Sequence, residues 1–178
     1  RRIREVERLL SGKTGPSIDV GFHCGYLTNY VTRIHHSPAV GIDISSEAIA
    51  HATVKYPADT WVTADLFHGI PLPHASFRVV TAFDLLEHLI SPSALLTEIA
   101  RVLQPGGLFL FTIPHETLLF RIVWKWWTVF GGATWQHVHV QEFDRAKIQA
   151  LLATSGFEVR SYHQTMCGMY QYFLCQKH

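Results

Sequence analysis

The segment 18–26 (IDVGFHCGY) carries residue types that suit a ligand-binding loop between a strand and a helix. Gly21 and Gly25 separate a short apolar run from a pattern with helical spacing. Glycine lets the backbone turn sharply and approach a ligand, and the start of the following helix offers free N–H groups. The segment therefore predicts a binding loop, although an ordinary strand-to-helix turn has the same pattern.

Two acids follow the next two apolar runs. Asp43 stands near the end of 39–44 (AVGIDI), where its carboxylate could accept hydrogen bonds from two ribose hydroxyls. Alternatively, it is an acid at a helix N-terminus that the helix dipole stabilises. Asp65 follows 61–64, where it suits an adenine amino group or is a solvated loop acid. Open α/β sheets bind ligands at the carboxyl ends of their strands, so the loop and both acids together predict one site.

An alternating order of strands and helices would position these residues. Helical spacing predicts helices over 3–11, 26–34, 47–55, 92–103 and about 144–154. Apolar runs predict strands over 17–20, 39–44, 61–64, 77–83 and 108–113, typical of a parallel sheet covered on both faces. The last two strands, 158–165 and 170–176, flank a short loop with Gly168 and predict an antiparallel hairpin. The fold class expected is α/β: one domain, 1–178, with a Rossmann-like, doubly wound, mostly parallel seven-stranded sheet and a C-terminal antiparallel hairpin.

Composition excludes several other classes. The 178 residues are 48% hydrophobic and 16% charged, which fits a globular domain with a sizeable core. A net charge of +1 without a basic stripe argues against nucleic acid as a partner. No apolar run reaches the roughly 18 residues of a transmembrane segment. The three cysteines form no CxxC pattern, so we expect no metal site and a cytoplasmic location.

Five segments, in order along nearly the whole chain, resemble class I S-adenosylmethionine-dependent methyltransferases, in particular the small bacterial-type methyltransferase domains. IDVGFHCG resembles the first motif of that family and VGID its acidic loop. TADLFHGIPLPHASFRVV is similar to the family's stretch that carries the adenine-side acid. AFDLLEHLISPSALLTEIARVLQPGGLFLFTIP resembles the most recognisable block of the family, and HVHVQEFDRAKIQALLATSGFEV resembles its late segment.

The resemblance implies S-adenosylmethionine as cofactor, S-adenosylhomocysteine as product, and a small-molecule acceptor with an O, N or C nucleophile. The cofactor-binding residues that it implies are Asp19, Gly21, Phe22, His23, Cys24, Gly25, Asp43, Ile44, Asp65, Leu66, Phe83 and Asp84. Phe83 and Asp84 would lie beside the sulfonium. His23 replaces the middle glycine of the family's Gly-x-Gly-x-Gly turn; we interpret it as tolerated, either crowding the cofactor or hydrogen-bonding its carboxylate.

Methyl transfer needs a base only when the acceptor is protonated and weakly acidic. His88 and the pair His137 and His139 are the candidates, since neutral imidazole accepts a proton near pH 7. Each has a second interpretation. His88 also fits a structural Glu-His position, and the pair also fits pocket lining or, less well, half of a metal site.

The stretch 118–140 is expected to be a substrate-side insertion, and its Trp-rich part 118–135 suggests an apolar or aromatic acceptor. That part could equally be an interfacial helix or a cover for the sheet or a subunit interface. Two other functions stay open. One is a non-catalytic cofactor- or partner-binding module that retains the fold. The other is a nicotinamide-dependent oxidoreductase, disfavoured because Gly-x-Gly-x-x-Gly spacing is absent.

Overall fold

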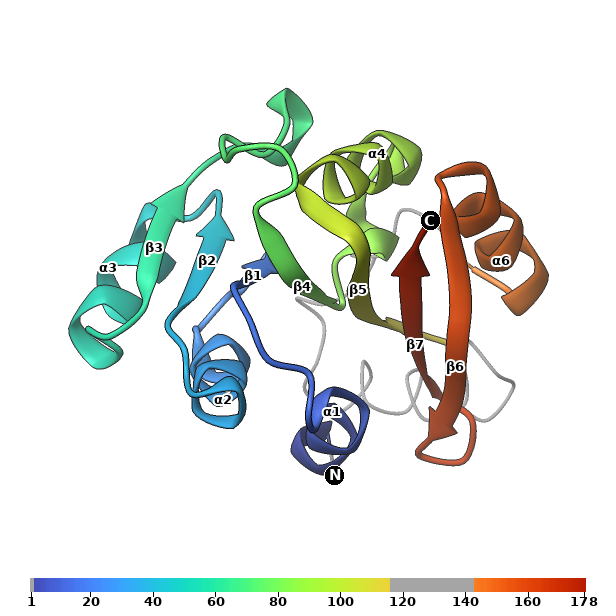
Figure 1. The fold of residues 1–178 in the computed structure, drawn as a ribbon, viewed down its shortest axis with the longest axis horizontal. Coiled ribbons are helices and arrows are strands. Elements are labelled where there is room, and N and C mark those ends of the chain that lie inside the picture. The colour runs from blue at the N-terminus through green and yellow to red at the C-terminus, as the bar shows by residue number, and fades with distance from the viewer. Residues whose placement is uncertain (1, 116–142) are drawn as a thin grey trace, which may run out of the picture.

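The computed structural model describes residues 2–115 and 143–178, which build a seven-stranded sheet with helices on both faces (Figure 1). The helices are α1 (Arg2–Leu10), α2 (Tyr26–His35), α3 (Ser46–Lys55), α4 (Pro92–Val102) and α6 (Arg145–Thr154), with 3₁₀ turns η1 (Leu66–His68) and η2 (Leu86–His88). The strands are β1 (Ser17–Val20), β2 (Ala39–Asp43), β3 (Thr60–Thr63), β4 (Phe77–Phe83), β5 (Leu103–Pro114), β6 (Phe157–Thr165) and β7 (Tyr170–Lys177).

The order of the strands in the sheet is β3-β2-β1-β4-β5-β7-β6. The first five strands of this order run parallel to one another, while β7 is antiparallel to both β5 and β6. The predicted fold class, including the C-terminal antiparallel hairpin, is therefore confirmed. Strand β5 begins at Leu103, five residues earlier than expected, because Leu103 pairs with Phe77 before the register shifts toward Val79 and Leu108.

Side chains that alternate along the central strands separate two cores. Val79 of β4, Leu110 of β5 and Tyr172 of β7 face α1 and α2, where Val6 and Val31 are buried. Their chain neighbours on the same strands point to the opposite face, where α4 and α6 pack. The buried residues on that face are Val80 and Ala82 of β4, Phe109 and Phe111 of β5, and Phe173 and Cys175 of β7. Because successive residues of a strand point to opposite faces, near-continuous apolar strands require this double cover.

Local capping sets where the helices begin. The Ser45 side chain accepts a hydrogen bond from the Ala48 N–H, and the Asp144 side chain accepts one from Lys147. Pro92 opens α4, where its missing N–H costs no hydrogen bond. The polar and proline residues between apolar runs thus mark where α3, α4 and α6 begin.

Gly41 in β2 allows an aromatic pair to pack beneath the first loop. A Cβ at this position would lie 2.4 Å from Cζ3 of Trp61 and 2.9 Å from Cδ1 of Phe22. The rings of Phe22 and Trp61 are 4.6 Å apart between centroids. Glycine at position 41 therefore supports the loop that follows β1. Within residues 2–115 and 143–178, no helix combines the length and the apolar character needed to cross a bilayer.

Candidate functional site

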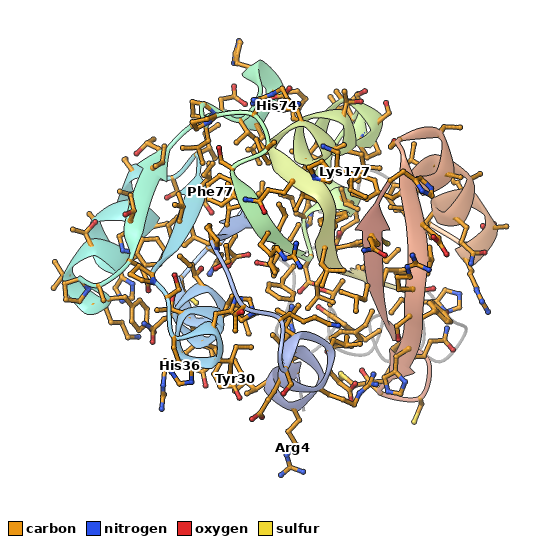
Figure 2. All side chains as sticks on the ribbon, viewed as in Figure 1. Arg4, Tyr30, His36, His74, Phe77 and Lys177 are labelled. Atoms are coloured by element: carbon orange, nitrogen blue, oxygen red, sulfur yellow. The ribbon has the colours of Figure 1, made fainter. Side chains whose placement is uncertain are left out.

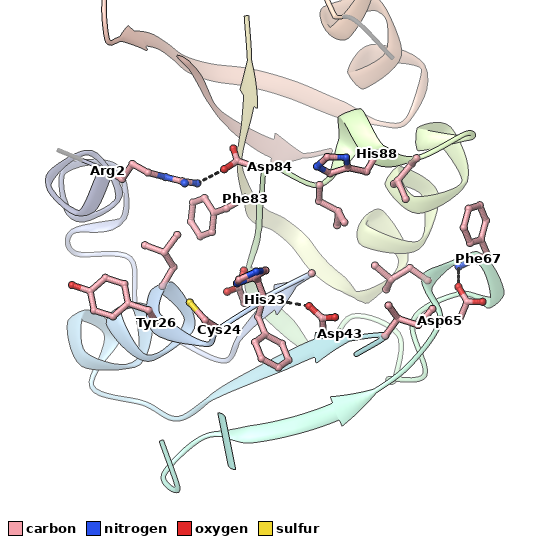
Figure 3. Close-up of a pocket in the computed structure, with 18 of the residues that line it drawn as sticks. Arg2, His23, Cys24, Tyr26, Asp43, Asp65, Phe67, Phe83, Asp84 and His88 are labelled. Carbon is pink, nitrogen blue, oxygen red and sulfur yellow. Dashed lines mark hydrogen bonds and ion pairs between the residues drawn. The ribbon is translucent and has the colours of Figure 1, made fainter. Parts of the chain in front are cut away.

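A cavity of about 860 Å³ opens at the carboxyl ends of the parallel strands (Figure 3). Its walls come from the loop after β1, the ends of β2 and β4, both 3₁₀ turns and helix α1. The lining residues are Arg2, Ile3, Asp19, Gly21, Phe22, His23, Cys24, Tyr26, Leu27, Asp43, Ile44, Asp65, Leu66, Phe67, Phe83, Asp84, Leu85, His88 and Leu89.

The loop after β1 has three residues in the left-handed region. Gly21 and Gly25 both have φ of +72°, and His23 has φ of +55°. A Cβ on Gly21 would lie 2.9 Å from Leu85, and one on Gly25 would lie 2.8 Å from Trp61. The two glycines are therefore required by backbone conformation and by space, whereas His23 carries a side chain in a conformation that glycine adopts more easily.

Asp43 is held at the end of β2 by two backbone donors. Its Oδ2 accepts from the His23 N–H at 2.9 Å, and its Oδ1 accepts from the Ser45 N–H at 3.0 Å. A carboxylate has about four acceptor positions, so each oxygen retains one for a ligand. This arrangement can accept a pair of adjacent hydroxyl groups.

Asp19 is buried in β1 between two threonine hydroxyls. Thr28 Oγ1 donates to it at 2.6 Å and Thr81 Oγ1 at 2.7 Å. Burial raises the pKa of Asp19 to about 6, although both hydroxyl donors oppose this shift. Near neutral pH the group is therefore mostly an anion at the inner wall of the cavity.

Asp65 lies two residues beyond β3, because the strand ends at Thr63 rather than at the expected residue 64. Its Oδ1 accepts from the Phe67 N–H at 2.9 Å and so caps η1. Leu66 and Phe67 of that turn line the cavity, and Phe67 is 66% exposed. This end of the site therefore combines an acid with apolar surface. Ile44, which is also 66% exposed and lines the cavity, adds to that apolar surface.

Asp84, directly after β4, is surrounded by donors from three other elements. Thr112 Oγ1 of β5 donates to its Oδ1 at 2.7 Å, and Arg2 Nη2 of α1 lies 2.7 Å from its Oδ2. The Tyr170 hydroxyl of β7 also donates to Oδ2. Burial, followed by the charge of Asp84, raises the pKa of the Tyr170 phenol, so this group stays a donor. The carboxylate is thus paired with one guanidinium and accepts hydrogen bonds from two neutral hydroxyls.

His88 and Glu87 of η2 differ in their exposure to the cavity. His88 lines the cavity and has interactions of its own. Glu87 is 2% exposed, and its Oε2 lacks a hydrogen-bond partner within the described part of the chain. Burial raises the pKa of Glu87 to about 8, and the charge of Asp84 adds to the effect. Glu87 is therefore mostly neutral at pH 7, and of the two only His88 can contact a ligand.

Most of the residues implied by the sequence resemblance meet at this cavity. Every one of the cofactor-binding candidates lines it except Gly25, which instead begins α2 and packs against Trp61. His137, His139 and the insertion 118–140 lie outside the described residues.

Several lining residues were missed by sequence reasoning. Phe67, Leu85 and Leu89 each follow a predicted residue directly, so extending each motif by one position would have found them; Tyr26 ends the predicted loop segment but was not among the contacts. Arg2 has no such local signal, because its approach to Asp84 depends on the packing of α1.

The cavity wall is rich in acids. Among the described residues that line it, four are carboxylates, Asp19, Asp43, Asp65 and Asp84, while Arg2 is the single arginine or lysine. Such a wall favours a ligand that carries net positive charge together with one anionic group. Residues 2–115 and 143–178 contain no group of three or more His, Cys, Asp or Glu side chains that could hold a metal ion.

Comparisons with known proteins agree with this architecture. A family model described as methyltransferase domain matches residues 2–162. A probable S-adenosylmethionine-dependent methyltransferase of Mycolicibacterium smegmatis is 34% identical over 124 residues, covering 67% of this chain and 43% of the relative. A malonyl-[acyl-carrier protein] O-methyltransferase of Hahella chejuensis is 30% identical over 141 residues, covering 78% and 48%.

Among solved structures, an S-adenosylmethionine-dependent methyltransferase from Mesorhizobium loti superposes with a TM-score of 0.77 at 18% identity, covering 98% of this chain and 96% of the other. The sheet order and the cavity at its carboxyl edge define a Rossmann-like methyltransferase fold. The chain belongs to the methyltransferase-domain family of class I S-adenosylmethionine-dependent enzymes. It spans less than half the length of the curated relatives named above.

Proposed function

We propose that the cavity binds S-adenosylmethionine and that this domain transfers the methyl group to a small-molecule acceptor. The observation that carries the proposal is Asp43, whose two oxygens are fixed by the N–H groups of His23 and Ser45 and keep free acceptor positions. A rigid carboxylate of this kind suits the two ribose hydroxyls of an adenosine.

The charge of the wall also supports this ligand. S-adenosylmethionine carries a sulfonium, an ammonium and a carboxylate, and therefore has a net positive charge. Four carboxylates and one guanidinium line the cavity, which complements that distribution. Asp65 and Leu66, with the exposed Ile44 side chain, offer an acceptor and apolar surface for an adenine.

The loop around His23 would hold the amino-acid part of the ligand. His23 binds Asp43 through its backbone N–H, and the residue also lines the cavity (Figure 3). The remaining predicted contacts of this loop are those of Asp19, Gly21, Phe22 and Cys24. We infer no contact for Gly25, which shapes the loop instead.

For methyl transfer the protein mainly has to position the methyl donor and the acceptor relative to each other. Bound S-adenosylmethionine would supply an activated methyl group; an acceptor aligned opposite the sulfur would bond to the methyl carbon as the carbon–sulfur bond breaks, with S-adenosylhomocysteine as the leaving group. Phe83 and Asp84 line the end of the cavity where β4 stops, and His88 stands beside them. Asp84 is paired with Arg2 and accepts hydrogen bonds from Tyr170 and Thr112, so we assign the base, where the acceptor needs one, to His88.

The acceptor is proposed to be a small molecule. One relative is a malonyl-[acyl-carrier protein] O-methyltransferase, so an oxygen nucleophile is a reasonable first class to screen. We further propose that 118–140 is a substrate-side insertion within a single domain, and that His137 and His139 line the acceptor side.

Calorimetric titration with S-adenosylmethionine, with NAD as a control ligand, tests the proposal. We expect saturable binding of S-adenosylmethionine and none of NAD. Asp43→Ala should weaken the binding at least about tenfold, since it removes charged acceptors of two hydrogen bonds. Glu47→Ala is the matched control, because it removes an acid from the exposed first turn of α3 near Asp43. A folded domain that fails to bind, or an Asp43→Ala variant that binds normally, contradicts the proposal.

The role of His88 needs a separate measurement once an acceptor has been found. His88→Ala should lower kcat by about 10² to 10⁴ for a hydroxyl acceptor. The Kd for S-adenosylmethionine should change little. An unchanged kcat would assign His88 to pocket lining instead.

A further inference from the structure

We propose that Arg2 binds the carboxylate of the methionine part of S-adenosylmethionine, and that Asp84 and Tyr170 position its guanidinium for this contact. The inference rests on the proposed function and deepens it, because it names the anion-binding side chain of the site. Arg2 belongs to α1, which lies outside the glycine loop and the strand ends that supplied the predicted site residues.

The first observation is the balance of charge. A zwitterionic amino-acid group needs a positive partner for its carboxylate as well as negative partners for its ammonium. Asp19 and Asp84 lie on the inner wall, whereas Arg2 is the single arginine or lysine among the described lining residues. An arginine fork matches a carboxylate in shape and hydrogen bonding, so it is the natural partner for this group.

The second observation is how firmly the guanidinium is held. Arg2 Nη2 lies 2.7 Å from Asp84 Oδ2, and the guanidinium carbon lies 5.1 Å from the centroid of the Tyr170 ring. The Tyr170 hydroxyl donates to the same Asp84 oxygen. Figure 3 shows the pair of Arg2 and Asp84. Asp84 and Tyr170 together therefore hold one flexible side chain in position before a ligand arrives.

The third observation is unused donor capacity. The Arg2 Nε is buried and has no hydrogen-bond partner in the described ranges 2–115 and 143–178. The side chain is nevertheless 40% exposed as a whole and lines the cavity. The buried Nε is out of reach of a ligand, but arginine has five N–H donors, and those of the exposed part of the guanidinium that do not face Asp84 can serve a second carboxylate.

The fourth observation places Arg2 near the amino-acid end of the proposed ligand. Its positive charge acts on Asp19, the buried acid of β1 immediately before the first loop, and lowers the pKa that burial has raised. Arg2 thus lies within electrostatic range of both the first loop and the end of β4. The methyl group and the methionine chain of the ligand would lie between these two points.

A carboxylate on the acceptor is the other anion that could reach this arginine. The two assignments differ in what removing Arg2 does to cofactor binding alone. Decarboxylated S-adenosylmethionine separates them, because it lacks only the carboxylate and keeps the adenosine, the sulfonium and the amine.

The experiment measures Kd by calorimetry for both ligands, without any acceptor, in the wild type and three variants. The variants are Arg2→Met, Arg2→Lys and the control Arg4→Met. Arg4 is an exposed arginine of the same helix and points away from the molecule in Figure 2, so its loss changes the net charge equally.

We expect the wild type to prefer S-adenosylmethionine over the decarboxylated ligand by about 10- to 100-fold. Arg2→Met should lose most of that preference by weakening S-adenosylmethionine alone. Arg2→Lys should keep part of it, because it retains the charge without the fork. Arg4→Met should behave as the wild type does.

The outcomes distinguish this inference from the proposed function. If the wild type binds S-adenosylmethionine but shows no preference, or if Arg2→Met keeps the full preference, Arg2 does not bind this carboxylate. Equal weakening of both ligands by Arg2→Met would assign Arg2 a purely structural role and would also overturn the inference. A wild type that binds neither ligand overturns the proposed function together with the role of Arg2.

Discussion

The backbone N–H of His23 donates to Oδ2 of Asp43 at 2.9 Å, which joins the loop after β1 directly to the end of β2. The backbone at position 23 is left-handed, with φ of +55°. The hydrogen bond depends on the main chain and not on the imidazole ring. The unusual residue at this position therefore leaves the connection between the two motifs intact.

His23→Gly should accordingly retain the site. Relief of the left-handed strain, about 1 kcal/mol, is offset by the greater freedom of glycine in the unfolded chain, so the free energy of unfolding should change by less than about 1 kcal/mol. The Kd for S-adenosylmethionine should change less than about tenfold, the size of one hydrogen bond. Denaturant unfolding and calorimetry measure the two. A folded His23→Gly domain that no longer binds would show that the ring is essential.

Gly41→Ala should destabilise the domain by about 1–3 kcal/mol through overpacking. The added methyl would lie 2.4 Å from Trp61 Cζ3 and 2.9 Å from Phe22 Cδ1, so both rings must move. Denaturant unfolding measures the loss. The double variant Gly41→Ala with Trp61→Leu should lose less than the two single variants together, because the smaller side chain makes room. Additive losses would indicate that the contact with Trp61 is not the cause.

Arg101→Ala should destabilise the loop between η1 and β4. Arg101 donates to the carbonyls of Ile70 and Leu72, at 2.7 and 3.0 Å, and also pairs with Glu98 at 2.8 Å. Losing these bonds should cost about 1–2 kcal/mol and speed amide hydrogen exchange at residues 69–73.

The matched control for that variant is Arg160→Ala, which breaks an exposed ion pair with Glu158 on β6. Exposed pairs contribute little, so a loss under about 0.5 kcal/mol is expected. Similar losses in the two variants would contradict the role assigned to Arg101.

Glu87→Gln should stabilise the domain increasingly as the pH rises from 5 to 8. The folded-state pKa of Glu87 is raised to about 8 from an ordinary value of 4.5, so the folded state holds a proton that the unfolded chain releases. Between these values the stability of the wild type falls with rising pH, by at most about 1.4 kcal/mol per unit. Glutamine stays neutral and avoids this loss, so the difference between variant and wild type should grow by on the order of 2 kcal/mol.

Unfolding by urea at several pH values measures the trend. Glu47→Gln, on the exposed first turn of α3, is the control and should not show it. A constant difference between Glu87→Gln and the wild type across this pH range would mean that Glu87 is ionised in the folded domain.

The alternation of strands and helices along the chain, and most of the residues that line the cavity, could be predicted because their signals are local. The apolar run that ends at Asp43 predicts β2, and the capping Ser45 predicts the start of α3. Both signals lie within a few residues of the elements that they predict. The register shift that starts β5 at Leu103 could not be predicted, since it depends on pairing with Phe77. Arg2 escaped prediction for the same reason: its partners Asp84 and Tyr170 come close only after α1 and β7 have packed on the sheet.

The position of β7 between β5 and β6 has a consequence for how the domain is made. A ribosome delivers β1 to β5 first, and β6 then emerges without its partner, because the described part of β6 pairs with β7. The loop after β1 and Asp43 can reach their final arrangement at that stage. Tyr170, which holds Asp84 and stacks on Arg2, arrives only with β7. We expect a nascent chain to assemble the adenosine half of its cavity first and to complete the other half only when the last strand is inserted.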